Sequence, residues 1–278
     1  MNIDLNRISG MNTHYSFYTI DDYFSSLEKL NIKNAELWTF NSHFFLDYNL
    51  YQNTKEIKEK SKKHNLKIIC ITPEQNNPKP YNIATSFPHL KEKTLNYFKN
   101  AVRAANELEC NKVLVTSGWA FYSENLEEAR KRSADMVQNI CEFASEKGVT
   151  IVIETLRYDE SHIVYNIPTL KEYMKMVNHP NLKITIDTGA MACAGESVRK
   201  FYEAFGDKIA HVHFVDGTPK GHLVLGEGNL PIEEYLQDFN ENHYRGYFSL
   251  EITHEKYYNN PQLADKNNMS YLVELSKR

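Results

Sequence analysis

Short apolar runs alternate along the chain with longer segments in which apolar residues recur every three or four positions. The short runs are typical of buried strands, and the longer segments have the period of amphipathic helices. The predicted strands cover residues 7–13, 35–38, 66–71, 112–116, 149–154, 183–187, 209–215 and 247–252. The predicted helices cover residues 20–30, 53–65, 89–108, 126–147, 168–177, 197–205, 231–239 and 261–276. This alternation predicts a parallel sheet.

Eight such units favour closure of the sheet into a barrel. The chain has 278 residues, and barrels of this kind run to about 250 residues. An open doubly wound sheet would need a Gly-x-Gly-x-x-Gly turn after the first strand, which Gly10, Met11 and Asn12 do not supply. No linker, repeat or low-complexity segment interrupts the pattern. We therefore expect residues 1–278 to form one α/β domain, a single (β/α)8 TIM barrel.

Four apolar runs each end on a residue that can bind a metal. These residues are Glu154, Asp187, His213 and Glu251. Successive members are separated by about one strand-helix-strand unit, roughly 30 residues or more. They would then lie at the same end of four successive parallel strands, which is the catalytic face of such a barrel. We predict that they converge on one divalent metal ion, although an ion pair or helix cap would explain any one of them alone.

The donor set indicates the kind of metal and its chemistry. Three carboxylates and one imidazole suit Mn²⁺, Co²⁺ or Ni²⁺, and Mg²⁺ or Zn²⁺ is also possible. Four protein ligands leave two positions open, which can chelate a ketone oxygen and the neighbouring hydroxyl of a sugar. Such a metal stabilises the enediolate formed when the carbon between them loses a proton. Glu154 and Glu251, on the fifth and eighth strands, would approach from opposite sides as two acid/bases.

Several short motifs carry a resemblance to a known family. The motifs are Glu36-Leu37-Trp38, Thr72-Pro73-Glu74-Gln75-Asn76, Pro80-Tyr81-Asn82, His211-Val212-His213-Phe214-Val215-Asp216 and Gly226-Glu227-Gly228. On these motifs the chain resembles the sugar-phosphate isomerase/epimerase superfamily of xylose-isomerase-like barrels, over nearly its whole length. Within that superfamily it is most similar to the fructoselysine 3-epimerase branch.

The resemblance implies a metal-dependent ketose 3-epimerase or a related isomerase, acting on a small-molecule sugar. It assigns the metal to Glu154, Asp187, His213 and Glu251, with the two glutamates as acid/bases. It also implies that Glu160 contacts the substrate near the carbonyl, and that the chain forms a homo-oligomer, a dimer or tetramer.

Two positions depart from the tagatose-type members of the family. Ala190 stands where those enzymes have a histidine, three residues after the aspartate ligand, and Pro219 stands where they have an arginine. His222 and Lys220, on one glycine-bent loop, are candidates to replace those contacts. His222 either contacts the substrate or is an ordinary loop residue.

Three more residues are candidates for substrate binding. Trp38, after the second strand, forms either an aromatic wall for a sugar ring or ordinary loop packing. Arg157 binds an acidic group of the substrate or pairs with Asp159 or Glu160. Glu74 belongs to one of the matching motifs and lies in the long loop after the third strand.

Four other residues have alternative interpretations. His211 precedes His213 by two positions and is predicted to be a hydrogen-bonded core histidine, one layer deeper in the barrel. Asp216 is expected to orient His213, with a turn cap as the alternative. His14 and His43 either line the pocket or lie in surface loops.

Charge and cysteine content narrow the functional classes. The net charge of −4 and the pI of about 6.3 supply no basic footprint for nucleic acid. The charge argues against an endonuclease IV-like nuclease. Such a nuclease also holds three zinc ions and would need more metal ligands after the second and third strands than His43 and Glu74. The four scattered cysteines and the polar N-terminus fit a cytoplasmic protein, and no apolar run has the length of a membrane span. A cyclitol (inosose-type) dehydratase, an aldose-ketose isomerase and a non-catalytic sugar-binding barrel remain as alternatives.

Overall fold

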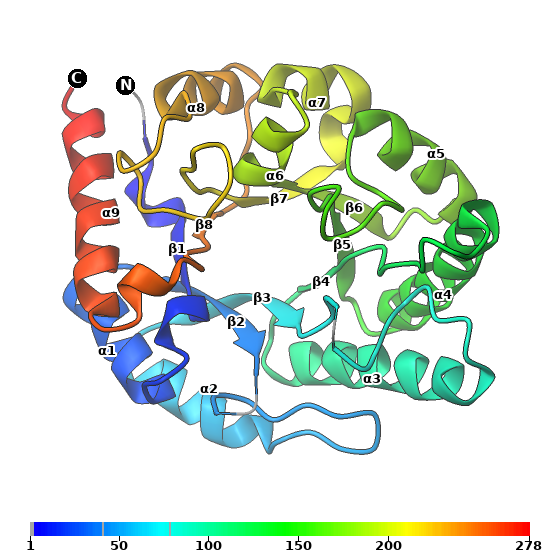
Figure 1. The fold of residues 1–278 in the computed structure, drawn as a ribbon. Helices are drawn as coiled ribbons and strands as arrows, with labels where there is room; N and C mark the ends of the chain where they lie inside the picture. The colour runs from blue at the N-terminus through cyan, green and yellow to red at the C-terminus, as the bar shows by residue number, and fades with distance from the viewer. Residues whose placement is uncertain (1–2, 41, 78) are drawn as a thin grey trace.

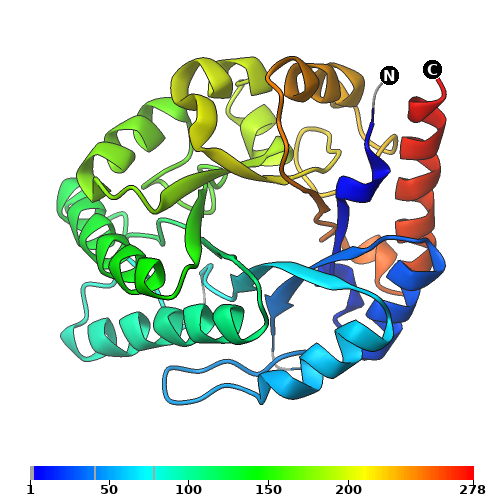
Figure 2. The same ribbon diagram turned by 180° about the vertical axis from the view of Figure 1, so that it is seen from behind.

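A computed structural model describes residues 3–40, 42–77 and 79–278. Within these residues, parallel strands pair in sequence order, and β8 pairs with β1 to close a barrel (Figures 1 and 2). The strands are β1 (Ile8–Met11), β2 (Asn34–Thr39), β3 (Lys67–Pro73), β4 (Lys112–Val115), β5 (Thr150–Glu154), β6 (Leu182–Asp187), β7 (Ile209–His213) and β8 (Phe248–Leu250). The expected (β/α)8 TIM barrel is therefore confirmed.

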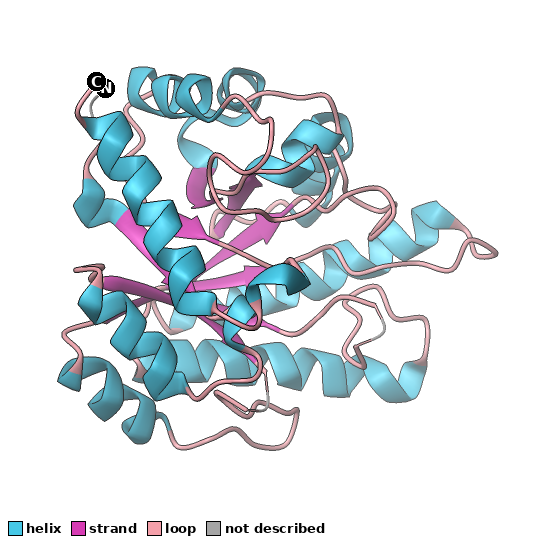
Figure 3. Cartoon of the chain, turned by 60° about the vertical axis from the view of Figure 1, so that its left-hand side comes forward, coloured by secondary structure: helices cyan, strands magenta, loops and turns pink. Residues whose placement is uncertain are grey.

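Helices surround the barrel, and the longer loops gather at the end toward which the strands run (Figure 3). The helices are α1 (Ile20–Lys29), α2 (Thr54–Lys63), α3 (Pro88–Glu107), α4 (Leu126–Glu146), α5 (Ile167–Val177), α6 (Thr188–Cys193), α7 (Val198–Phe205), α8 (Ile232–Glu241) and α9 (Pro261–Ser276). Their amphipathic sequences explain this placement, since α1 buries Tyr23, Phe24 and Leu27 while its first turn is acidic. In the described part of the chain, no helix has the length and apolar character needed to cross a bilayer.

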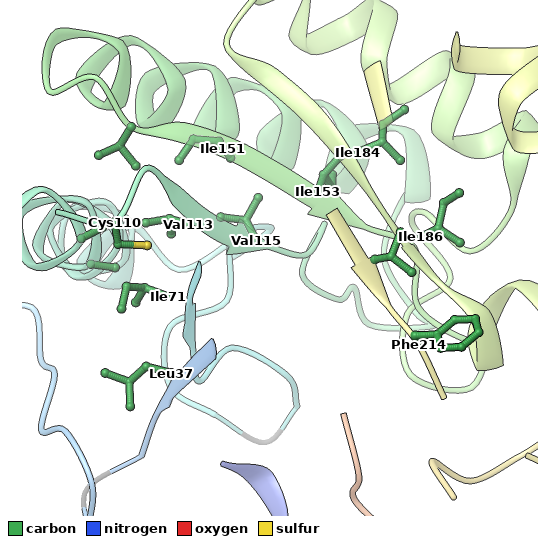
Figure 4. Close-up of a cluster of buried hydrophobic side chains, with 14 of the residues drawn as sticks. Leu37, Ile71, Cys110, Val113, Val115, Ile151, Ile153, Ile184, Ile186 and Phe214 are labelled. Carbon is green, nitrogen blue, oxygen red and sulfur yellow. The ribbon is translucent and has the colours of Figure 1, made fainter. Parts of the chain in front are cut away.

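The alternation of side chains along each strand decides which residues reach the interior of the barrel. On β5, Ile151 and Ile153 belong to the large core shared with the helices (Figure 4), whereas Val152 packs with residues of β3 and β4 inside the barrel. Glu154 has the same parity as Val152 and so faces inward. The same rule places Asp187 inward beside outward Ile186, and His213 inward beside outward Val212.

Three local differences from the predicted elements concern the catalytic end. β7 ends at His213 and β8 at Leu250, so both strands are shorter than predicted. The six-residue helix α6 was not predicted, because it follows β6 without a loop and contains Gly189. Asp187 begins that helix by accepting the N–H of Ala190 at 2.5 Å, so this residue is both a strand end and a helix cap.

Candidate metal centre

The four predicted ligands come together at the carboxyl end of the barrel. Glu154, Asp187, His213 and Glu251 each offer one ligand atom, and these atoms all lie within 4.8 Å of one another. His213 Nδ1 lies 2.6 Å from Glu154 Oε1 and 3.0 Å from Glu251 Oε2. Three of the residues are buried, and the Glu251 side chain is only 15% exposed. The strand ends therefore form one compact cluster, as the spacing along the sequence predicts.

The atoms of this cluster approach one another without forming hydrogen bonds. Among the described residues, Glu154 Oε1, Asp187 Oδ2 and His213 Nδ1 are buried and have no hydrogen-bond partner. Buried polar atoms in proteins normally have such a partner, and an ion is one explanation when they do not. Carboxylate oxygens and an imidazole nitrogen that converge in this way fit a divalent cation.

The electrostatics of the cluster also fit a cation. Burial raises the pKa of Glu154 to about 7, against the opposing effect of His213. Burial alone would lower the pKa of His213, but Glu154, Glu36 and Glu251 together raise it well above its ordinary value. These shifts favour a proton on His213 and on Glu154, whereas burial would raise the pKa of Glu251 but His213 and His222 outweigh it and lower that pKa. A bound cation would displace those protons and neutralise the same charge.

A residue that we did not single out as a site residue supports His213 from below. Glu36 Oε1 lies 3.1 Å from His213 Nε2, and Glu36 Oε2 lies 2.7 Å from His211 Nε2. His211 is therefore the hydrogen-bonded core histidine that was predicted. Glu36 was visible in the sequence only as part of a matching motif, because its contacts are with a strand far along the chain.

The expectation that Asp216 orients His213 is wrong. Its carboxylate accepts four backbone N–H groups of the β7–α8 loop, those of Gly217, Gly226, Gly228 and Leu230. The physical reason is that β7 ends at His213, so the chain has already turned into the loop at Asp216. Gly228 permits this arrangement, since a Cβ there would lie 2.2 Å from Asp216 Oδ1. Asp216 therefore shapes the loop that carries His222.

A cavity of about 300 Å³ opens beside the cluster. It is lined by Glu154, Asp187 and Glu251 and by all five residues predicted to bind substrate, which are Trp38, Glu74, Arg157, Glu160 and His222. The cavity is bordered by the candidate metal ligands and by polar residues of the surrounding loops, so it suits a polar small molecule.

His222 reaches the cluster of candidate ligands from the β7–α8 loop. Its Nδ1 lies 3.2 Å from Glu251 Oε2, and its Nε2 lies 3.6 Å from Asp187 Oδ2. Burial lowers the pKa of His222, but the carboxylates of Asp187 and Glu251 outweigh that effect and raise it to about 9. The loop is held from outside by an ion pair of 2.8 Å between Lys220 and Asp159.

Charged groups of both signs line the rest of the cavity. Arg157 pairs with Glu160 at 2.9 Å and with Asp159 at 3.3 Å, which is the pairing foreseen as an alternative to substrate binding. Burial raises the pKa of Glu160. Glu74 pairs with Lys79 at 2.7 Å. These pairs leave the charges partly exposed, so a ligand with its own ionic groups can exchange partners with them.

Neither interpretation of His14 and His43 was correct. Both side chains are buried rather than on the surface, and neither is part of the cavity lining formed by the described residues. His14 Nε2 lies 2.9 Å from Asp265 Oδ1, and His43 Nδ1 lies 2.7 Å from the side-chain nitrogen of Asn12. The loops after β1 and β2 are covered by neighbouring elements, which the sequence pattern does not reveal.

The chain is similar to known proteins in both sequence and fold. Residues 24–274 match the family described as xylose isomerase-like TIM barrel. Fructoselysine 3-epimerase of Shigella flexneri is 28% identical over 246 residues, covering 88% of each chain. A structure of D-psicose 3-epimerase with D-tagatose, from Clostridium cellulolyticum H10, matches with a TM-score of 0.79 at 14% identity and covers 97% of this chain and 98% of that one. A probable 3-DHS dehydratase from Bacillus anthracis matches with a TM-score of 0.74 at 19% identity, over 96% of this chain and 98% of that one. At these identities the two structures establish a shared fold.

Proposed function

The chain belongs to the xylose isomerase-like TIM barrel family, and on this basis we propose that it is a divalent-metal-dependent sugar epimerase. The proposed reaction inverts the carbon next to the ketone of a ketose or ketose derivative. The observation that supports it most is the convergence of four ligand atoms within 4.8 Å beside a cavity. The 28% identity to a fructoselysine 3-epimerase makes an amine-linked ketose the first substrate class to test. We further propose that residues 1–278 form one barrel domain.

Glu154, Asp187, His213 and Glu251 would hold the metal. A divalent ion bound there supplies polarisation of the ketone and stabilisation of the enediolate, and the donor set favours Mn²⁺, Co²⁺ or Ni²⁺. One of the two glutamates removes the proton from the carbon next to the ketone. The other glutamate returns a proton to the opposite face of that carbon, which inverts its configuration. This acid-base step contributes roughly 10²–10⁴-fold to the rate.

The remaining cavity residues would orient the substrate. His222 and Glu160 line the cavity beside the cluster and would hydrogen-bond the oxygens next to the reacting carbon. Trp38 also lines the cavity and would pack against the sugar chain. Arg157 and Glu74 carry opposite charges, so they suit a substrate that has an ionic group beyond its sugar.

A dehydratase is the second candidate, because a probable dehydratase shares the fold and a metal-stabilised enolate serves both reactions. The nuclease alternative is weaker. The early residues that might have served a larger zinc cluster already have partners, since His43 contacts Asn12 and Tyr18 and Glu74 pairs with Lys79.

The test is a substrate panel with the metal controlled. Protein freed of metal with EDTA is reloaded with Mn²⁺, Co²⁺ or Ni²⁺ and incubated with fructoselysine-type amines, free ketoses, ketose phosphates and an inosose. Nuclear magnetic resonance of the products should show the epimer at the carbon next to the ketone, formed only with metal. Loss of water from the inosose would identify the dehydratase. Metal binding with no conversion of any ketose would contradict the proposal.

A further inference from the structure

We propose that Glu36 is a positioning residue of the metal centre, which holds the ring of His213 in the orientation and tautomer that a metal requires. His211 would support Glu36 from the layer below. This inference rests on the proposed metal centre, and it concerns a residue to which the proposed reaction gives no role.

The contact crosses the interior of the barrel. Glu36 lies on β2, which pairs with β1 and β3, whereas His213 and His211 lie on β7, which pairs with β6 and β8. The Glu36 side chain is fully buried, and so is that of His211. A carboxylate that spans two non-adjacent strands therefore fixes their separation as well as the angle of each imidazole ring.

The hydrogen bonds select the tautomer of His213. The ionised carboxylate of Glu36 has only acceptor atoms, so the proton of the 3.1 Å contact belongs to His213 Nε2. When the ring is neutral, as a metal ligand must be, the lone pair is then on Nδ1, the atom that lies 2.6 Å from Glu154 Oε1 and 3.0 Å from Glu251 Oε2. Metal-binding histidines generally donate their second ring N–H to such a partner, which also makes the ligand more basic.

The neighbouring donors show that Glu36 is held rather than free. Its Oε2 lies 2.7 Å from His211 Nε2, and its Oε1 also accepts the hydroxyl of Thr72. Glu36, Cys70 and His211 lie close enough to suggest a second metal site. However, the carboxylate oxygens and His211 Nε2 are already joined by hydrogen bonds, so these groups form a support for His213.

The first experiment replaces the carboxylate with its amide. In Glu36→Gln one end of the side chain still accepts an imidazole N–H, but the other end presents an NH₂ group to the second ring. One ring must then turn or change tautomer. We expect the dissociation constant for Mn²⁺ or Co²⁺, measured by competition with a chromophoric chelator, to rise about 10–100-fold. The visible absorption of the Co²⁺ form should change as well.

Asp265→Asn is the matched control. Asp265 is also buried and accepts three side-chain hydrogen bonds, from His14, Tyr15 and Ser26. Both Asp265→Asn and Glu36→Gln disturb a buried carboxylate, so we expect the two variants to lower the melting temperature to a similar extent. Only Asp265→Asn should leave the metal dissociation constant unchanged. A Glu36→Gln protein that is folded and binds metal within twofold of the wild type would overturn the proposal.

A second experiment needs no variant and therefore does not depend on folding of Glu36→Gln. Nitrogen-15 spectra of histidine-labelled wild-type protein should show His213 protonated at Nε2 both without metal and with Zn²⁺ as a diamagnetic ion. A proton on Nδ1 in the metal-free protein, with Nε2 unprotonated, would refute the tautomer argument. If the wild-type protein binds no metal at all, the proposed function fails. If it binds metal and Glu36 has no effect, only this inference fails.

Discussion

Asp187 caps α6 and is a proposed metal ligand, and the substitution Asp187→Asn separates these two roles. Its Oδ1 accepts the N–H of Ala190 at the start of α6, a position where asparagine serves as well as aspartate. Its Oδ2 has no hydrogen-bond partner and faces the cluster, 3.6 Å from His222 Nε2. The variant therefore keeps the shape of the side chain and the helix cap but removes one negative charge from the proposed metal centre.

The expected effects on the metal-free and metal-bound states differ in size. Two unit charges at 4.8 Å, the distance within which all the ligand atoms of the cluster lie, interact by about 3.5 kcal/mol at an effective dielectric constant of 20. Without metal, the variant loses repulsion from the carboxylates of Glu154 and Glu251. It also loses attraction to the rings of His213 and His222, and these effects oppose each other. We therefore expect the metal-free melting temperature to stay within a few degrees of that of the wild type. With metal, the same charge is lost from the coordination of a dication, so affinity should fall by about a hundredfold, or about 2.7 kcal/mol.

Thermal unfolding with EDTA and with increasing Mn²⁺ measures both effects in one assay. Mn²⁺ at about 100 times its dissociation constant should stabilise the wild-type protein by about 2.7 kcal/mol, and the variant much less at the same concentration. Glu233→Gln is the control, because it removes a carboxylate from a surface pair with Arg278 and should change neither value by much. The reasoning is refuted if metal-free Asp187→Asn unfolds far below the wild type, or if it keeps the full metal-induced shift.

Three further predictions follow from the site. Glu154→Gln and Glu251→Gln should each lower kcat about 10²–10⁴-fold while circular dichroism shows an intact fold, and near wild-type turnover by either variant would rule out the two-base scheme. Arg157→Met should raise KM several-fold for a ketose that carries a carboxylate or phosphate but not for a neutral ketose; equal effects on both, in steady-state kinetics, would count against a subsite for ionic groups. Asp216→Asn should leave two loop N–H groups facing an amide NH₂ and cost about 1–3 kcal/mol for each, so hydrogen exchange in the β7–α8 loop should accelerate, and an unchanged exchange rate would contradict its role as the loop anchor.

Local pattern was sufficient to predict most of the barrel and the convergence of the cluster. The alternation of apolar residues along β5, β6 and β7 places Glu154, Asp187 and His213 on the inner face. Short parallel strands joined by helices then bring their carboxyl ends together. Both features depend on residues that are near one another in sequence, so each can be read from the chain before any tertiary contact is known.

The parts that sequence reasoning missed depend on tertiary contacts. Glu36 meets His213 across the barrel, from a strand 177 positions earlier in the chain, and no local period encodes that distance. Asp216 is three residues from His213, and this short separation suggested that Asp216 orients the His213 ring. Because β7 ends at His213, the Asp216 carboxylate instead accepts N–H groups of the following loop. The burial of His14 depends on Asp265 of α9, which is 251 positions away. Residues of this kind become interpretable only when the packing is known.

Solvent deuterium exchange tests the central claim most directly. The protein loaded with Mn²⁺ or Co²⁺ is incubated in D₂O with the amine-linked ketose, and the label is located by nuclear magnetic resonance. The account predicts one deuterium at the carbon next to the ketone in the epimeric product, with exchange abolished by EDTA and by Glu251→Gln. Exchange that persists without metal, or a metal-loaded protein that exchanges no proton in any ketose tested, would contradict it.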